Sequence, residues 1–321
     1  MTGGNIYNHM VCDVLQERGF DIVEKKAYTA YQGRGFTYLD ALFTYVTKTS
    51  HQNNIEIMDY SAAAWSSSRI RGKRIIIMFH FDLAETRKKK KHQFFFNRFL
   101  KKAKDAKIIV ISTHWKDFLE SAGLTDIDII YCAYDVNKYQ PYLAKEEFLR
   151  KYDLPDKPII YLGKNSKPKT FNTYMQLKPL ANDCLLITSG QTREFAGPIH
   201  LDLNFEGYCS LLYASSVTVT MPQFSEGWSR IAHESLICGT PVIGNGKGGM
   251  KELLENTHQQ ILSDNDPECL LKAVKNIISS GQRVAHHDCL YAKSFDLNYF
   301  GERWAKIIIE TNQQQNGKKE K

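Results

Sequence analysis

The sequence predicts an α/β protein built on parallel, doubly wound sheets, and two observations support this fold class. Short apolar runs alternate with segments of helical composition along most of the chain. Most of these runs are apolar at both alternating positions, which is typical of strands covered by helices on both faces of a parallel sheet. The predicted strands are IIIMF at 75–79, IIVI at 108–111, IDIIY at 127–131, IIYL at 159–162, LLIT at 185–188 and VTVT at 217–220.

The chain is predicted to begin with a helix. Ile6, Met10 and Val14 recur every four residues, and Gly19 stands where a helix C-cap belongs. FDIV at 20–23 is the expected next strand. No apolar run precedes the glycine pair that opens the helix, so we expect either a reduced first sheet or a sequence that starts downstream of its natural beginning.

Two domains are predicted. Residues 137–158 contain three prolines and a charged stretch, and they separate two α/β series. We therefore place residues 1–150 in a first Rossmann-like domain and residues 151–296 in a second, followed by a C-terminal helix with a frayed tail over residues 297–321. Each half has a usual domain size, and two such domains that face each other form a cleft.

Composition excludes several classes of protein. The 321 residues are 43% hydrophobic and 24% charged, which excludes disorder as the main state. No apolar run reaches the roughly 18 residues of a membrane-spanning helix, and the N-terminus lacks a signal-peptide pattern. The seven cysteines are scattered singly, which favours a reducing compartment. We therefore predict a cytoplasmic protein, and its net charge of +7 indicates an anionic partner.

The strongest functional pattern is PQFSEGWSRIAHESLICGTPVIGNGKGGMKELL at 222–254. Glu226 is predicted at a helix entrance, with Glu234 eight residues later, so a regular helix would separate the two carboxylates by about 12 Å along its axis. Glycosidases need their paired carboxylates within about 5–9.5 Å, so direct hydrolysis is disfavoured. The pair suits a sugar nucleotide, with its ribose diol at Glu234, its hexose near Glu226 and its diphosphate at the helix amides beside Gly227.

This stretch resembles the E-x7-E region of retaining glycosyltransferases of family 4, which have the GT-B fold. The match includes GTPVI at 239–243 and a G-G-x-x-E element at Gly248, Gly249 and Glu252. GGNIYNHMVCDVLQERGFDIV is similar to the family's opening glycine pair and first helix, and YLGKNSKPKT at 161–170 is similar to its phosphate element. The resemblance implies two Rossmann-like domains with a cleft between them and a C-terminal helix that returns toward the N-terminal domain.

The resemblance also implies a role for each matched residue. Lys164 and Lys169 would hold the donor diphosphate, but Lys164 replaces an arginine, and Thr170 and Ser229 replace glycines, which indicates weaker donor binding. His80, directly after IIIMF, would lie beside the donor sugar. The residues expected to act in catalysis are Glu226, His80, Lys169 and Lys164, and those expected to bind the donor are Glu234, Gly227, Trp228, Ser229, Glu252, Gly248, Gly249, Gly3 and Gly4.

Each assignment has a plainer structural alternative. The glutamate pair could lie at the surface or cap a helix, and Glu252 could simply favour the first turn of its own helix. The two lysines could belong to a solvated loop, His80 to the core, and the glycine pair to a flexible terminus. HHDC at 286–289 and DID at 126–128 contain possible metal ligands, but adjacent ligands suit neither tetrahedral spacing nor one helix face, so we expect no metal.

A basic and aromatic run covers residues 87–107, RKKKKHQFFFNRFLKKAKDAK. Its composition predicts a helix that lies in an anionic membrane interface. One alternative is a solvated helix whose phenylalanines pack on the core. A nucleic-acid patch is the other, but no recognised nucleic-acid motif accompanies the run, so we expect no nucleic-acid partner.

Together these patterns predict a retaining hexosyltransferase that needs neither a metal nor another cofactor. It would move a hexose-type sugar from a nucleoside diphosphate donor to a hydroxyl group of a lipid-linked or cell-surface glycan at the cytoplasmic face of the membrane. The two lysines would stabilise charge on the leaving diphosphate, and Glu226 would support positive charge at the anomeric carbon. The main alternative is a non-catalytic protein of the same fold that binds a membrane or a polyanion. An epimerase or phosphorylase is a third candidate.

Overall fold

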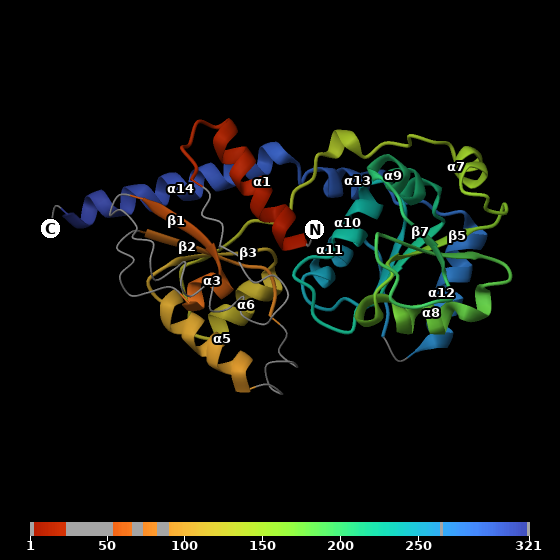
Figure 1. Ribbon diagram of the computed structural model, residues 1–321, viewed down its shortest axis with the longest axis horizontal. Coiled ribbons are helices and arrows are strands. Elements are labelled where there is room, and N and C mark those ends of the chain that lie inside the picture. The colour runs from red at the N-terminus through yellow and green to blue at the C-terminus, as the bar shows by residue number, and fades with distance from the viewer. Residues whose placement is uncertain (1–2, 24–53, 66–72, 82–89, 264–265, 320–321) are drawn as a thin grey trace. The chain divides into compact units, whose positions relative to one another are not determined.

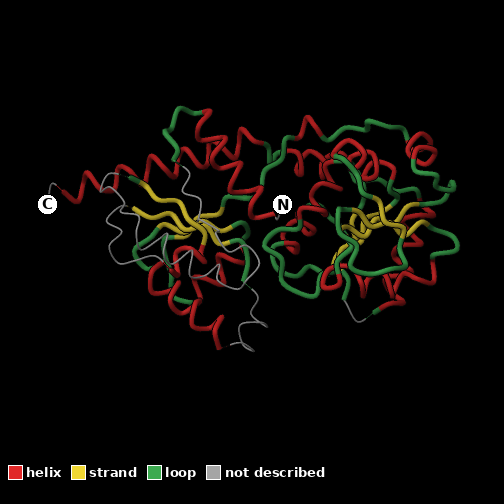
Figure 2. Tube along the Cα trace, in the orientation of Figure 1, coloured by secondary structure: helices red, strands yellow, loops and turns green. Residues whose placement is uncertain are grey.

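The computed structural model describes residues 3–23, 54–65, 73–81, 90–263 and 266–319. The chain forms two compact units. The first unit comprises Met1–Cys132 and Leu297–Lys321, and the second comprises Ala133–Asp296. In each unit the strands lie between helices, as Figure 1 and Figure 2 show. The α/β fold class and its two parallel sheets are therefore confirmed.

The first unit contains a parallel sheet in the order β1-β2-β3-β4 within the described residues. Its strands are β1 (Ile55–Asp59), β2 (Lys73–Met78), β3 (Lys107–Val110) and β4 (Ile127–Ile129), and its helices are α1 (Gly3–Glu17), α3 (Tyr60–Trp65), α5 (Lys90–Ala103), α6 (Thr113–Ser121) and α14 (Leu297–Lys319).

Two helical layers cover this sheet. On one face, Ile76 and Met78 of β2 belong to a buried cluster with residues of α3, α5 and α6. On the other, Tyr7 of α1 packs edge-to-face on Phe300 and Trp304 of α14, with ring centroids 5.0 and 6.3 Å away. Figure 1 shows α1 beside the first part of α14. The C-terminal helix thus completes the core of the first unit, as the family resemblance implies.

The end of α1 confirms the predicted cap and corrects the predicted strand after it. Gly19 has a φ of +80°, and its N–H donates to the Gln16 carbonyl at 2.9 Å. Residues 20–23 are irregular, with Val23 75% exposed. A central strand would have its apolar side chains covered on both faces, and those of FDIV are not.

The second unit has a parallel sheet in the order β10-β9-β8-β5-β6-β7 within the part described. Its strands are β5 (Ile159–Lys164), β6 (Leu185–Ser189), β7 (Ile199–Leu201), β8 (Val217–Thr220), β9 (Val242–Gly244) and β10 (Gln260–Ile261). Read from β7, with β5 as strand 1, this is the 3-2-1-4-5-6 order of a dinucleotide-binding fold. The strand order reverses between β5 and β8.

Helices again lie on both faces. The α-helices of the second unit are α7 (Lys145–Lys151), α8 (Asn172–Leu177), α9 (Phe205–Ala214), α10 (Arg230–Ile237), α11 (Met250–Asn256), α12 (Pro267–Ser280) and α13 (His286–Lys293). The described residues of this unit also form the 3-10 turns η1 (Val136–Lys138) and η3 (Lys178–Leu180) and the π-helical turn η2 (Lys167–Phe171). Residues of α8 and α12 pack on one face of the sheet, while on the other face Ser235 of α10 shares a 2.8 Å hydrogen bond with Thr218 of β8.

The structural division falls at Cys132 and Ala133, earlier than the boundary placed after residue 150. The intervening segment makes its contacts within the second unit. The Tyr213 hydroxyl donates to the Tyr139 carbonyl at 2.9 Å, and the Leu143 N–H donates to the Ser210 hydroxyl oxygen at 3.1 Å. This segment therefore opens the second unit and does not link the two.

Candidate functional site

The candidate site of the second unit lies at the carboxyl ends of β5 and β8. Lys164 ends β5, Lys169 follows in the turn η2, and Glu226 lies in the loop after β8. The two strands are neighbours, paired at Ile160 and Val217. The strand order reverses between them, and ligands of open α/β sheets bind in the crevice at such a reversal.

Glu226 and Lys169 form the central contact of this site. The Lys169 Nζ lies 2.6 Å from Glu226 Oε1 and 5.3 Å from the centre of the Phe224 ring. The Glu226 side chain is only 9% exposed, whereas that of Lys169 is 40% exposed. A carboxylate this buried requires a charged or hydrogen-bonding partner. The ammonium group supplies one and also reaches solvent, where an anionic ligand can approach.

The glycine pair of the G-G-x-x-E element fixes the backbone of Glu226. Gly248 pairs with Glu226 in a parallel bridge, and the Gly249 N–H donates to the Glu226 carbonyl at 3.0 Å. Gly248 has a φ of +69°, and a Cβ there would lie 2.1 Å from the Glu226 carbonyl oxygen. Only glycine fits this position. Two motifs that are separate in the sequence thus form one structural element.

The predicted spacing of the two glutamates along one helix is wrong. Helix α10 begins at Arg230, and Glu226 lies in the preceding loop, held by its bridge to Gly248. An axial distance of 12 Å therefore does not apply to the pair. Ser229 is the N-cap residue and its side chain makes no capping hydrogen bond, so that side chain does not occupy the amides of the first turn.

Thr170 stands where the family pattern has a glycine, and its contact with Lys164 shows what the threonine does. The Thr170 hydroxyl donates to the Lys164 carbonyl at 2.6 Å and lies 3.4 Å from the Leu162 carbonyl. A threonine in place of glycine thus ties the turn η2 back onto the end of β5. The Lys164 side chain itself is exposed.

Glu234 belongs to a buried polar cluster. Its Oε2 accepts from the Tyr208 hydroxyl at 2.5 Å, and its Oε1 accepts from the Tyr139 hydroxyl at 3.2 Å and from Arg230 at 3.0 Å. The Arg230 guanidinium lies 4.7 Å above the Tyr134 ring. Burial, with the nearby charge of Glu234, raises the pKa of Tyr208 well above its ordinary value. The tyrosines are therefore protonated donors.

This cluster changes the interpretation of Glu234. A carboxylate has about four acceptor sites, and three donors already occupy three of them, so a ribose diol, with its two hydroxyl donors, would have to displace at least one of these contacts. Arg230 is detectable in the sequence, because it stands four residues before Glu234 on the same helix. Tyr139 and Tyr208 are not, because they come from distant segments.

Trp228 is a core residue in this structure, with 6% of its surface exposed. Its indole N–H donates to His233 Nδ1 at 2.9 Å, and His233 Nε2 in turn donates to the Ala292 carbonyl at 2.8 Å. Burial lowers the pKa of His233 to about 3, so the imidazole is neutral. This chain of bonds fixes α10 against α13, and sequence analysis did not single out His233.

The other predicted site residues lie as follows. Gly227 is buried next to Trp228, and Glu252 is half-buried in the first turn of α11. In the first unit, His80 is exposed after β2, and Gly3 opens α1. A Cβ on Gly4 would lie 3.1 Å from the Phe79 ring, so this glycine lets α1 approach the end of β2 closely.

No protein-family model and no curated protein sequence matches the chain significantly. Solved structures do. Sucrose-phosphate synthase from Thermosynechococcus elongatus superposes with a TM-score of 0.78 at 14% identity, over 96% of this chain and 93% of that one. Anabaena HepE in complex with UDP-glucose gives a TM-score of 0.68 at 14% identity, over 93% and 88%.

A third similar structure is the α,α-trehalose 6-phosphate synthase from Burkholderia multivorans. It gives a TM-score of 0.69 at 10% identity, over 97% of this chain and 81% of that one. At such low identity the likeness shows the fold, and the fold that this chain shares with these glycosyltransferase structures is GT-B.

Proposed function

We propose that the chain is a retaining glycosyltransferase that moves a hexose-type sugar from a nucleoside diphosphate to a hydroxyl acceptor without a catalytic metal. The observation that carries the proposal is the contact between Lys169 and Glu226 at the strand reversal of the second unit. The fold supports the proposal, because HepE, which shares it, binds UDP-glucose.

The two lysines suit a diphosphate. Lys164 is exposed at the end of β5. Lys169 follows five residues later in the turn η2 and is partly exposed. Their ammonium groups, with the amides at the start of α10, would stabilise the negative charge that grows on the leaving diphosphate. This is the charge that a metal ion would otherwise balance.

Glu226 suits the sugar. Its Oε1 lies 2.6 Å from the Lys169 ammonium nitrogen, and its backbone is held by Gly248 and Gly249. A fixed carboxylate stabilises positive charge at an anomeric carbon better than a mobile one, since no reorganisation is needed in the transition state. In the family that the sequence resembles, the departing phosphate takes the acceptor proton, so no separate base is assigned.

The experiment is a donor screen followed by a transfer assay. Thermal shift with UDP, GDP and ADP sugars selects the donor. Radiolabelled donor is then mixed with candidate acceptors in the presence of a chelator, and NMR gives the anomeric configuration of the product. We expect Glu226→Gln and Lys169→Ala each to lower turnover by about 10²- to 10³-fold.

The matched control is Lys167→Ala, which removes an exposed lysine from the same turn, and it should keep near-normal turnover. His80→Ala tests the role that the family resemblance assigns to His80. Unchanged turnover in both Glu226→Gln and Lys169→Ala would refute the site, and an inverted product would refute the retaining mechanism.

We also propose that the acceptor is a lipid-linked or cell-surface glycan, reached through contact of α5 with an anionic membrane. Lys90 and Lys101 of α5 are exposed, as is Lys104 after it. Partial burial and the like charges of Arg98 and Arg74 lower the pKa of Lys102, which indicates a concentration of positive charge here. Among the described residues, every helix is too short or too polar to span a bilayer.

The phenylalanines of α5 limit this contact to the membrane surface. Phe96 and Phe99 are buried, and Phe96 stacks on Phe81 with centroids 4.1 Å apart. Phe94 is 60% exposed. The structure thus favours the alternative in which phenylalanines of this helix pack on the core. The proposed attraction is therefore mainly electrostatic.

Two features favour a non-catalytic binder as the second candidate. Glu234 already accepts three hydrogen bonds within the chain, and Lys164 lacks the planar fork of the arginine usual in the family. Both features would weaken donor binding. Calorimetry separates the candidates: saturable binding of one nucleotide sugar with no product in any acceptor mixture would favour the binder.

A further inference from the structure

A second candidate site lies in the second unit, at the amino ends of its parallel strands, opposite the candidate donor site. A cavity of about 400 Å³ is lined by Val242 and Gln260, the first residues of β9 and β10. Lys164 is the last residue of β5, and Glu226 lies in the loop after β8, so both are at the carboxyl ends of their strands. In a parallel sheet these two ends are opposite edges, so the cavity is remote from the candidate donor site.

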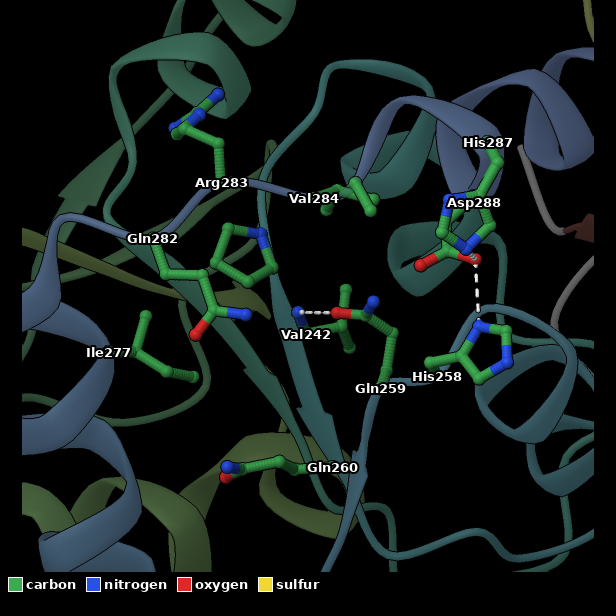
Figure 3. Close-up of a pocket in the computed structure, with 12 residues that line it drawn as sticks. Val242, His258, Gln259, Gln260, Ile277, Gln282, Arg283, Val284, His287 and Asp288 are labelled. Carbon is green, nitrogen blue, oxygen red and sulfur yellow. Dashed lines mark hydrogen bonds and ion pairs between the residues drawn. The ribbon is translucent and has the colours of Figure 1, made fainter.

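Three potential metal ligands gather in the wall of this cavity (Figure 3). Asp288 Oδ1 lies 3.0 Å from His258 Nδ1 and 3.2 Å from His287 Nε2. The three ligand atoms all lie within 4.8 Å of one another. The Asp288 side chain is only 5% exposed, whereas both imidazoles are 72% exposed.

These separations match the edges of a zinc site. Bonds of about 2.0–2.2 Å from a tetrahedral zinc ion place neighbouring ligand atoms about 3.3 Å apart. The two contacts of Asp288 already have nearly this length. The third pair, the two imidazole nitrogens, lies within 4.8 Å, and both imidazoles are exposed, so they can rotate toward the separation that the ion requires. Two imidazoles and one carboxylate with an open position are a donor set that zinc uses, as do other first-row cations such as Fe²⁺.

We propose that His258, His287 and Asp288 bind a zinc ion, with water in the remaining position. The inference is independent of the proposed transfer reaction. Asp288 lies in the first turn of α13, and His258 follows α11. His258 has a φ of 49°, a backbone conformation that non-glycine residues seldom adopt and that often marks a functional position.

The ion would cross-link two segments of the second unit. It would join the connection between α11 and β10 to the start of α13, the helix that holds the carbonyl acceptor of His233. The adjacent residues at 286–289 do not by themselves have the spacing of a metal site, and for that reason no metal was predicted here. The third ligand comes from His258, which is 30 residues from Asp288 and is brought to it by the fold.

The test uses the full chain without an affinity tag and Zn²⁺ alone as the probe. Competition with a chromophoric chelator gives stoichiometry and affinity, and visible absorption of the Co²⁺ form reports the coordination. We expect one Zn²⁺ per chain and a raised Tm. His258→Ala and His287→Ala should each weaken binding by about tenfold or more.

His286→Ala is the matched control, because it removes the neighbouring exposed histidine of α13. It should bind zinc like the unaltered protein. The proposal is overturned if the unaltered protein binds no zinc, if all three variants bind equally, or if binding is lost only in Cys269→Ser, which removes an exposed thiol. All three substituted histidines are exposed, so circular dichroism should show unchanged folds.

Discussion

At the scale of single residues, the cluster around Glu234 shows how a buried charge is kept in place. The Tyr208 hydroxyl is the donor to Oε2, whereas Oε1 has two donors, Tyr139 and Arg230. Tyr208→Phe would leave Oε2 without this donor in a buried site. We expect it to lower the free energy of unfolding by about 1–3 kcal/mol, measured by urea denaturation.

Tyr142→Phe is the control for this prediction, since the Tyr142 hydroxyl donates to a backbone carbonyl at the surface. It should change stability by no more than about 0.5 kcal/mol. Equal effects of the two substitutions would mean that the carboxylate does not depend on Tyr208.

His233 gives a pH dependence whose sign follows from its burial. Its pKa is about 3 in the folded chain, against 6.5 ordinarily. The unfolded chain therefore binds a proton that the folded chain does not as the pH falls below 6.5. Above pH 6.5 the neutral imidazole makes its full contribution to the free energy of unfolding. As the pH falls from 6.5 toward 3, that free energy decreases by about 1.4 kcal/mol per pH unit.

His233→Gln should remove this component, because a glutamine does not titrate. We expect urea denaturation between pH 7.5 and 4.5 to give a shallower loss of stability in this variant than in the unaltered protein. His286→Gln, at an exposed position, should keep the original slope. Parallel profiles for all three proteins would show that His233 is not held neutral.

At the scale of elements, α5 joins core packing and surface charge in one helix. Phe96 and Phe99 point into the first unit, and Lys101 and Lys104 remain at the surface. Each basic residue near an anionic membrane contributes about 1 kcal/mol. The double variant Lys101→Glu, Lys104→Glu should therefore bind anionic vesicles at least about tenfold more weakly, as measured by sedimentation. It should remain folded, because both side chains are exposed.

The control for α5 is Lys272→Glu with Lys275→Glu, which changes the net charge equally at two exposed positions of α12. It should leave vesicle binding near its original level at the same ionic strength. Equal losses in both double variants would indicate attraction by net charge alone. Equal binding of neutral and anionic vesicles would exclude an electrostatic contact.

The same elements show what the sequence could and could not predict. The central strands, such as IIYL at 159–162, were predictable because both faces are apolar. Strand β1 was missed, as were β7, β9 and β10, whose two or three residues give too little periodicity. Strand β4 is equally short but was predicted because it lies in the longer apolar run IDIIY. In the site, the motif identified Glu226. The contacts of Glu234 and His258 depend on segments that only the fold brings together.

At the scale of the whole molecule, the chain leaves the first unit at Cys132 and returns to it at Leu297. The first unit therefore depends on a helix that follows the whole second unit in the sequence. Trp304 is fully buried there and lies 6.3 Å from Tyr7, whose hydroxyl donates to the Ile130 carbonyl at 2.9 Å. Both ends of the chain thus take part in one core, while the second unit has a core of its own.

This arrangement predicts where a single cavity will act. Trp304→Ala should cost the first unit about 3–5 kcal/mol, because it removes a large, fully buried side chain. Hydrogen exchange should then become faster in α1, β2 and β3, which lie far from residue 304 in the sequence, and remain unchanged in β5 and β8. Ile309→Ala is the control, because Ile309 lies on the same helix but is 48% exposed. It should change neither the stability nor the hydrogen exchange of either unit. Faster exchange in both units would show that they unfold as one cooperative body, and faster exchange confined to α14 would show that this helix does not support the first core.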